Sequence, residues 1–255
     1  MTSNPLALQL YTVRDQLASG RTAVLAAIRD FGYGAVEPYD VRTDPDALRA
    51  DLDEAGLAVC SVHARALGED AAALLDGART VGADTVIVPS VPAERFADRD
   101  AIAALAREFN QAAARAADAG LRFGYHNHAF EFSLAGGRYG LEVLADALDP
   151  GVLLEVDTYW AAVGCQDPGA VPALLGRLGD RVRYLHVKDG PVTREDPMTA
   201  VGTGRMPVAE ILAACPSAEW HVVELDRCAT DMLIAVRESA AWLTGHGLAT
   251  AAPAR

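Results

Sequence analysis

The sequence predicts an α/β protein that folds as a single (β/α)8 TIM barrel. Short apolar runs typical of buried strands alternate with longer segments whose apolar residues recur at helical spacing. Eight such strand–helix units follow one another in 255 residues with no internal linker, which matches the size and period of a closed barrel. An open doubly wound sheet is disfavoured because no GxGxxG motif follows the first strand.

The elements follow from this alternation. Strands are expected at residues 7–11, 35–38, 58–63, 85–89, 122–126, 152–157, 182–186 and 220–224. Helices are expected at residues 17–31, 46–55, 71–81, 102–119, 139–148, 170–178, 208–214 and 231–243. Glycine, which ends helices at little steric cost, precedes a strand at Gly32, Gly56, Gly82, Gly120 and Gly179. We therefore expect one domain over residues 1–244 and a flexible C-terminal tail over 245–255.

Composition excludes several classes of function. The formal charge of −13, from 22 basic and 35 acidic residues, disfavours a nucleic-acid partner, which needs a broad basic surface. No apolar run approaches the ~18 residues of a membrane span, and the N-terminus has no signal pattern, so a cytoplasmic protein without a membrane partner is expected. The four cysteines form no CxxC pair, which disfavours a thiolate metal site. A homo-oligomer is left open.

In a TIM barrel, the chemistry lies at the C-terminal ends of the strands. Polar residues that fall at these ends are Gln9, Tyr11, Glu37, His63, Ser90, His126, His128, Asp157, His186, Lys188, Glu224 and Asp226. Side chains alternate along a strand, so His186 and Lys188 share a face that we expect to point into the barrel mouth. The same alternation turns His221 outward, where a structural role is expected.

Three of these residues predict a metal site. Asp157, His186 and Glu224 converge from the last three strands, and two carboxylates with an imidazole suit Mn²⁺, Mg²⁺, Co²⁺ or Zn²⁺. The fourth ligand should come from the strand at 122–126. Alternation along that strand favours His126, whereas ligand hardness favours Glu131, and both stay open.

Three further observations concern the mouth of the barrel. Lys188 is the only lysine among 22 basic residues, which indicates a position where a compact ammonium is needed. The segment 189–207 is long for a loop between a strand and its helix, so a lid is expected, with Arg205 able to bind a phosphate or carboxylate. Trp160, three residues after Asp157, is placed either to stack on the face of a substrate or to pack against the protein, and both stay open.

The motifs at residues 8–15, 125–132, 157–160, 186–189 and 223–226 resemble those of the xylose isomerase-like TIM barrels, which include sugar phosphate isomerases/epimerases and inosose dehydratase-like members. This resemblance implies that Asp157, His186 and Glu224 are the metal ligands of the family. Many members carry Glu at the end of strand five, where this chain has His126. Residues 201–205 also resemble the Gly-x-Gly loop of the family, with Thr203 where an acidic residue is common.

The sequence therefore predicts a sugar isomerase/epimerase that depends on one divalent metal. It would move a proton next to a carbonyl through an enediolate. Glu131 or Glu224 would remove the proton, and Lys188 would stabilise oxyanion charge. The expected substrate-binding residues are Gln9, Tyr11, Glu37, His63, His126, His128, Trp160 and Arg205. The partner would be a small sugar or polyol ketone. The alternatives are a dehydratase or lyase acting on a keto-sugar or inosose with the same site, and a non-catalytic sugar-binding barrel.

Overall fold

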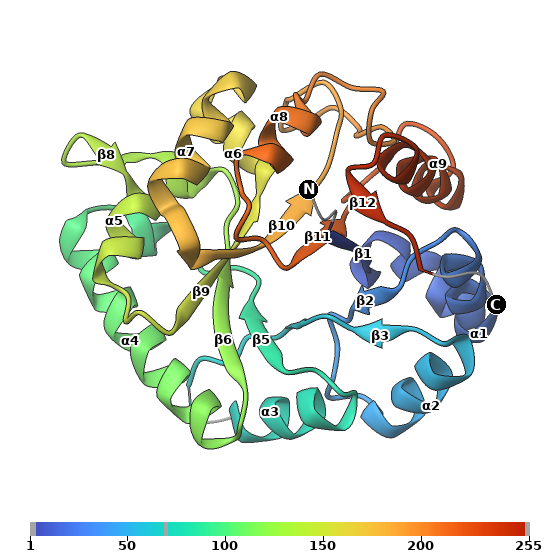
Figure 1. The fold of residues 1–255 in the computed structure, drawn as a ribbon. Helices are drawn as coiled ribbons and strands as arrows, with labels where there is room; N and C mark the ends of the chain where they lie inside the picture. Colours follow the sequence, from blue (N-terminus) through green and yellow to red (C-terminus); the bar gives the residue numbers. More distant parts are fainter. Residues whose placement is uncertain (1–3, 69–70, 253–255) are drawn as a thin grey trace.

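A computed structural model describes residues 4–68 and 71–252, in which parallel strands form a nearly closed barrel surrounded by helices (Figure 1). The order of the strands around the sheet is β3-β2-β1-β11-β10-β9-β6-β5-β4. These strands are β1 (Asn4–Gln9), β2 (Ala35–Glu37), β3 (Ala58–Val59), β4 (Val62–His63), β5 (Thr85–Val88), β6 (Arg122–His126), β9 (Val152–Asp157), β10 (Val182–Val187) and β11 (Trp220–Val223). The predicted TIM barrel is confirmed.

The third predicted strand is two strands in the structure. Its first half, β3, pairs with β2, and its second half, β4, pairs with β5. The turn of the chain at Cys60 and Ser61 lets one segment face both neighbours, because the Cys60 N–H donates to Val36 O while the Ala64 N–H donates to Ile87 O. This segment therefore brings the two ends of the sheet together.

The outer layer consists of α1 (Arg14–Asp30), α2 (Pro45–Ala55), α3 (Ala71–Thr80), α4 (Arg99–Asp118), α5 (Gly140–Ala147), α6 (Thr158–Cys165), α7 (Val171–Leu178), α8 (Val208–Ala213) and α9 (Met232–Gly245). The five glycines that were predicted to end helices have φ between 60° and 102°. Helix α6 was not expected. It begins directly after β9 because the Asp157 side chain accepts from Trp160 N, and its mostly apolar sequence shows no one-sided stripe.

Alternation along the strands produces two layers inside the barrel. Ala7, Ala35, Cys60 and Val222 form a small apolar cluster in the interior. Two residues further along their strands, the chain places polar side chains on the same face, for example Glu37 after Ala35. A polar layer therefore lies on a packed apolar floor at the C-terminal end of the barrel.

The expected C-terminal tail is partly incorrect. Strand β12 (Ala249–Thr250) pairs with β1 in parallel, with Asn4 opposite Ala249. The His221 imidazole helps to hold it, since Nδ1 lies 3.1 Å from Leu248 O and Nε2 lies 3.2 Å from Asn4 Nδ2. Two residues are too few to show a strand pattern in the sequence. Residues 253–255 of the tail lie outside the described residues.

A short antiparallel hairpin, β7 (Leu134–Ala135) with β8 (Arg138–Tyr139), follows β6 outside the barrel. Within the part of the chain that the structure describes, no helix has the length and apolar character needed to cross a membrane.

Candidate functional site

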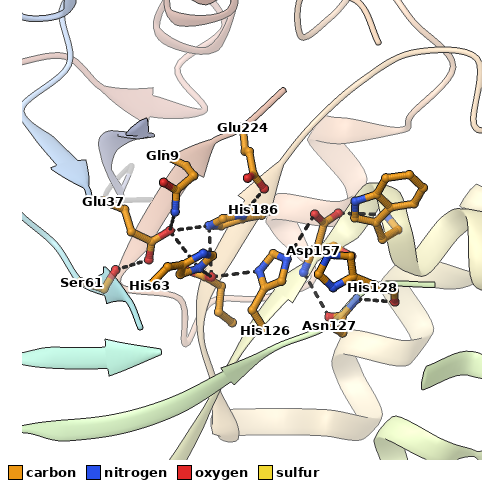
Figure 2. Close-up of polar contacts among 12 residues, drawn as sticks. Gln9, Glu37, Ser61, His63, His126, Asn127, His128, Asp157, His186 and Glu224 are labelled. Carbon is orange, nitrogen blue, oxygen red and sulfur yellow. Dashed lines mark hydrogen bonds and ion pairs between the residues drawn. The ribbon is translucent and has the colours of Figure 1, made fainter. Parts of the chain in front are cut away.

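Buried polar side chains gather inside the barrel at the C-terminal ends of its strands (Figure 2). They are less than 7% exposed and are Gln9, Glu37, His63, His126, Glu155, Asp157, His186, Lys188 and Glu224. Polar groups are costly to bury without partners, so the contacts among them decide what the cluster can do.

Four of these residues form a group that can hold a cation, which we call the mouth group: His126, Asp157, His186 and Glu224. Each offers one ligand atom, and these atoms lie within 4.8 Å of one another. His186 Nδ1 is 2.8 Å from Glu224 Oε2, and His126 Nε2 is 3.7 Å from Asp157 Oδ2. Two carboxylates and two imidazoles are a suitable donor set for Mn²⁺, Co²⁺ or Zn²⁺.

The geometry of Asp157 supports this assignment. Its Oδ1 accepts from Trp160 N at 2.8 Å as the N-cap of α6, which fixes the carboxylate. Its Oδ2 is buried and lies 2.8 Å from Lys188 Nζ, but it has no hydrogen bond of good geometry. Burial and the nearby Glu224 raise the pKa of Asp157 to about 6. Asp157 Oδ2 is thus an oxygen that pairs with a cation, and the Lys188 ammonium is the cation that it faces here.

A second group, which we call the deep group, contains His63, His126, Glu155 and His186. Glu155 Oε2 lies 2.6 Å from His63 Nε2, 3.0 Å from His126 Nδ1 and 3.1 Å from His186 Nε2. The two groups share His126 and His186. A neutral imidazole carries one proton on its two nitrogens, so it cannot offer both nitrogens to cations at once. The deep group is therefore best described as the hydrogen-bonding layer behind the mouth group.

Glu37 completes this layer. Its Oε2 accepts from Gln9 Nε2 at 2.6 Å and lies 2.8 Å from His186 Nε2, while its Oε1 accepts from Ser61 Oγ at 2.5 Å. Burial and then the neighbouring Glu155 raise the pKa of Glu37. Gln9 and Glu37, which were expected to contact substrate, thus lie beneath His186 and do not line the cavity above the site.

Lys188 is enclosed by three carboxylates. Its Nζ lies 2.8 Å from Asp157 Oδ2, 2.6 Å from Glu224 Oε2 and 2.8 Å from Asp226 Oδ2, and the side chain is 1% exposed. Burial alone would lower the pKa of Lys188, but the carboxylates of Asp157, Asp226 and Glu224 outweigh it and hold the pKa well above its usual value. The ammonium therefore stays charged next to the mouth group.

Glu131 lies outside both groups. Its Oε1 accepts from Tyr125 Oη at 2.6 Å, and its Oε2 accepts from His128 N at 3.0 Å. Burial raises its pKa to about 7. Of the two candidates for the fourth ligand, the structure brings His126 into the mouth group and uses Glu131 to fix the chain at His128.

A cavity of about 560 Å³ opens above the mouth group. Its lining includes residues that were expected at the strand ends, namely Tyr11, His63, Ser90, His126, His128, Glu224 and Asp226. It also includes Tyr39, Arg42 and Arg65, which were not expected. Glu224 is thus both a member of the mouth group and accessible from the cavity.

His128, which lines this cavity, and Trp160, which does not, have unused hydrogen-bonding atoms. His128 Nδ1 and Trp160 Nε1 are buried and have no hydrogen-bond partner among the described residues. The two rings lie nearly parallel at 6.4 Å, and Lys188 Nζ lies 5.7 Å over the Trp160 ring. Burial and then the charge of Lys188 lower the pKa of His128 to about 4, so its imidazole is neutral at pH 7.

The loop that was expected to be a lid is tied down by Asp189. This buried carboxylate accepts from the backbone N–H groups of Gly190, Gly202, Gly204 and Met206. Arg205, in the same loop, is exposed and does not line the cavity, so the structure does not bring it to the site. The Gly-x-Gly segment therefore binds the Asp189 carboxylate through its backbone N–H groups.

Sequence reasoning missed several residues that organise the site. Glu155 lies two residues before Asp157 on the same face of β9, and this parity was the signal available for it. Asn127 links β6 to β9, since its Nδ2 donates to Asp157 O at 3.2 Å and its Oδ1 accepts from Asp157 N at 3.1 Å (Figure 2). No pattern in the sequence identifies Asn127 or Ser61.

Comparison with known proteins gives the family. A family model described as the xylose isomerase-like TIM barrel matches residues 25–243, which is most of the chain. The chain belongs to the xylose isomerase-like TIM barrel family. The resemblance inferred from the sequence motifs is confirmed. No curated protein matches the sequence.

Solved structures agree with this xylose isomerase-like fold. A sugar phosphate isomerase/epimerase from Parabacteroides distasonis superposes with a TM-score of 0.81 at 24% identity, covering 98% of this chain and 96% of that one. A probable 3-DHS dehydratase from Bacillus anthracis gives 0.71 at 12% identity, covering 94% and 98%. An L-ribulose 3-epimerase gives 0.63 at 18% identity, covering 96% and 94%. At these identities, the likeness concerns the fold.

Proposed function

We propose that this protein is a divalent-metal-dependent enzyme that moves a proton next to a carbonyl on a small polyhydroxylated ketone or aldehyde, as a sugar isomerase or epimerase does. The observation that carries the proposal is the mouth group, His126, Asp157, His186 and Glu224, at the floor of the cavity. Similar structures that include a sugar epimerase and an isomerase/epimerase support the same class.

A divalent cation bound by the mouth group would polarise the carbonyl and an adjacent hydroxyl of the substrate. Glu224 is the base in this proposal, because it lines the cavity and because Lys188 and His186 counter the effect of burial and hold its pKa well below the usual value, so it is ionised. Lys188 would stabilise negative charge that develops on the substrate oxygen.

His63 and His128 would bind the remaining hydroxyls, and the neutral His128 imidazole supplies a donor and an acceptor. Trp160 does not line the cavity and would support His128 from behind, with the two rings nearly parallel. Tyr11 completes the proposed contacts at the cavity wall. His126, with Nδ1 on Glu155 and Nε2 in the mouth group, has no nitrogen left for the substrate in this assignment. Glu131 acts here through His128 by fixing its backbone, and Arg205 has no role in this assignment.

A dehydratase or lyase reaction is the second candidate, and one observation favours it. Glu224 is the only carboxylate of the mouth group that lines the described cavity, and Glu131 is bonded to Tyr125 and His128. Glu224 can remove a proton and return it to a leaving hydroxyl on the same face while Lys188 stabilises negative charge, whereas epimerisation needs a second proton-transfer group on the opposite face of the substrate.

The test combines metal analysis with solvent exchange. The purified protein would be loaded with Mn²⁺ and incubated in D₂O with a panel of keto-sugars and inososes, and products would be followed by NMR. Deuterium incorporated at the α-carbon supports proton transfer, and loss of water identifies the dehydratase. Sugar binding without any exchange would leave a non-catalytic sugar-binding barrel and overturn the proposal.

The proposed setting is the cytoplasm, with a small-molecule partner. Cys60, Cys165, Cys215 and Cys228 are free thiols, as expected in a reducing compartment. The acidic charge of −13 supports a partner other than nucleic acid.

A further inference from the structure

We infer that the cavity contains an aromatic subsite, formed by Tyr11 and Tyr39, that binds a second ring attached to the reacting sugar. The substrate would then be a keto-glycoside, whose reacting ring carries a ketone away from its blocked anomeric carbon, or another two-ring ketone, instead of a free monosaccharide. This inference rests on the proposed function, because it assigns the reacting sugar to the mouth group.

The two tyrosines form an ordered pair at the cavity wall. Their ring centroids lie 5.5 Å apart with the planes at 87°, an edge-to-face arrangement. The Arg14 guanidinium carbon lies 4.2 Å from the centroid of the Tyr11 ring, and Arg14 donates to both Tyr11 O and Asp226 O. Tyr11 is therefore held in place before any ligand arrives, which reduces the entropy lost on binding.

The exposure of this pair is unusual within the described residues. Only four large hydrophobic side chains there are exposed, and two of them are Tyr11 and Tyr39, each at 41%. The other two, Leu134 and Ile234, do not line the cavity. Exposed aromatic surface concentrated in one wall of a pocket marks a binding surface.

The size of the cavity leaves room for a second ring. Its volume of about 560 Å³ falls within the ~300–1,000 Å³ of pockets that bury drug-sized ligands, so the cavity has room for a ligand with two rings. The same cavity reaches His126 and Glu224 of the mouth group, so one ligand can contact both regions.

The charges at this wall favour a neutral ring over an anionic group. Arg42 and Arg65 line the cavity, but so do Asp40, Asp226 and Glu224. Arg42 also interacts with Asp40, so its charge is partly balanced. The negative face of a tyrosine ring, in contrast, attracts the polarised C–H bonds of a sugar ring and stacks with an aryl ring.

The test measures binding alone and compares affinities for free sugars and for their p-nitrophenyl glycosides, by ligand-observed NMR titration of the Zn²⁺-loaded protein over a panel of hexoses and pentoses. The glycoside of the sugar that binds best should bind about tenfold tighter than that sugar. Its aryl protons should receive strong saturation transfer from the protein.

Variants locate the effect. Tyr39→Ala should abolish the affinity ratio between glycoside and sugar, and Tyr39→Phe should keep most of it because the ring remains. Leu134→Ala, which removes an exposed apolar side chain elsewhere, should leave the ratio unchanged. An unchanged ratio in Tyr39→Ala, or a ratio near one in the wild type, would overturn the subsite while sugar binding still supports the proposed function. If no free sugar or glycoside binds, both proposals fail.

Discussion

Two histidines of the site each face a carboxylate on either side. His126 directs Nδ1 to Glu155 and Nε2 toward Asp157, whereas His186 directs Nε2 to Glu37 and Nδ1 to Glu224. A carboxylate behind a ligating imidazole fixes the orientation of the ring and makes it a better donor to a metal. The inner carboxylates therefore matter to metal binding without touching the ion.

The fourth ligand can be tested at the level of single residues. His126→Asn should weaken Mn²⁺ binding more than the ~10–100-fold that follows from loss of an outer partner, because it removes a ligand of the mouth group. Glu131→Gln should leave the affinity within a few-fold, since that side chain bonds to Tyr125 and His128. Isothermal titration of both variants decides, and the reverse order of affinities would restore Glu131 as the ligand.

Glu155 provides a second prediction at this scale. Glu155→Gln keeps the shape of the side chain but removes the charge that three imidazoles face. Mn²⁺ affinity should fall by about 10–100-fold while the mouth group stays complete. Electron paramagnetic resonance of bound Mn²⁺ measures it. Wild-type affinity in this variant would show that the deep group has no influence on the metal.

Lys188 can be examined through stability. In the metal-free protein, Lys188→Met leaves Asp157, Glu224 and Asp226 facing one another without their shared cation. Breaking a buried ion pair in this way typically costs about 3–5 kcal/mol, so the free energy of unfolding in urea should fall by that order. Lys188→Arg should recover only part of it, because a guanidinium fork does not fit the space of an ammonium. Equal stability of Lys188→Met and wild type would contradict the central role of the ammonium.

Single residues also show what could be read from the sequence. Asp157, His186, Glu224 and His126 were located by strand ends and alternation, because parallel strands place their C-terminal residues at one rim. Whether each of them binds metal remains a prediction. Alternation cannot separate a residue that lines the cavity from one that lies a layer below, and for this reason Glu37 was expected at the substrate.

At the level of elements, the loop after β10 depends on one carboxylate. Asp189 binds four backbone N–H groups, and Gly204 lies against it so closely that an added Cβ would be 2.1 Å from Asp189 Oδ1. The length and composition of segment 189–207 indicated a mobile lid. The segment is ordered because Asp189 at its start binds the backbone of residues 202–206 near its end. Neither length nor composition reveals such a contact.

This contact predicts the effect of a methyl group. An alanine Cβ at position 204 would overlap the buried Asp189 carboxylate and the backbone nitrogen of Gly190. Gly204→Ala should therefore displace Asp189, destabilise the protein and expose the 189–207 loop to protease. Gly176→Ala, in α7 with nothing within 4 Å of the added Cβ, is the matched control and should not destabilise. Limited proteolysis followed by mass spectrometry compares the two. Equal cleavage in both variants would refute the idea that Asp189 holds the 189–207 loop in place.

The positions of the strands and of most helices followed from periodicity, whereas α6 and the break between β3 and β4 did not. The helix α6 is apolar on several sides because it packs between neighbours, so it lacks the stripe that reveals surface helices. The break arises because one short segment pairs with two different strands, and pairing partners are not encoded in the local pattern.

For the whole molecule, His221 links acid stability to the closure of the barrel. Its pKa is lowered to about 4, chiefly by burial, against about 6.5 in an unfolded chain. Between these values the unfolded state binds the proton and the folded state does not. Stability is therefore lost as the pH falls from about 6.5 to 4, by roughly 3 kcal/mol for this residue.

Urea unfolding at several pH values tests this link in the whole protein. His221→Gln should lose less stability than the wild type between pH 7 and pH 4, because the variant has no group to protonate at this position. Subtraction of the two curves removes the contribution of His128, which has a similarly lowered pKa. Parallel curves would mean that His221 does not titrate in this range.

The place of β1 in the barrel has a consequence for biosynthesis. Strand β1 is made first, yet one of its edges pairs with β11, where Leu6 lies opposite His221. Until a ribosome has delivered residues 220–223, that edge presents unpaired backbone N–H and C=O groups, which other chains can bind. A nascent chain that stalls after β10 therefore carries nearly all of the barrel, yet β1 is still an unpaired edge strand that can bind other chains. We expect such stalled chains to be retained by chaperones, and full-length chains to be released once β11 has covered the edge.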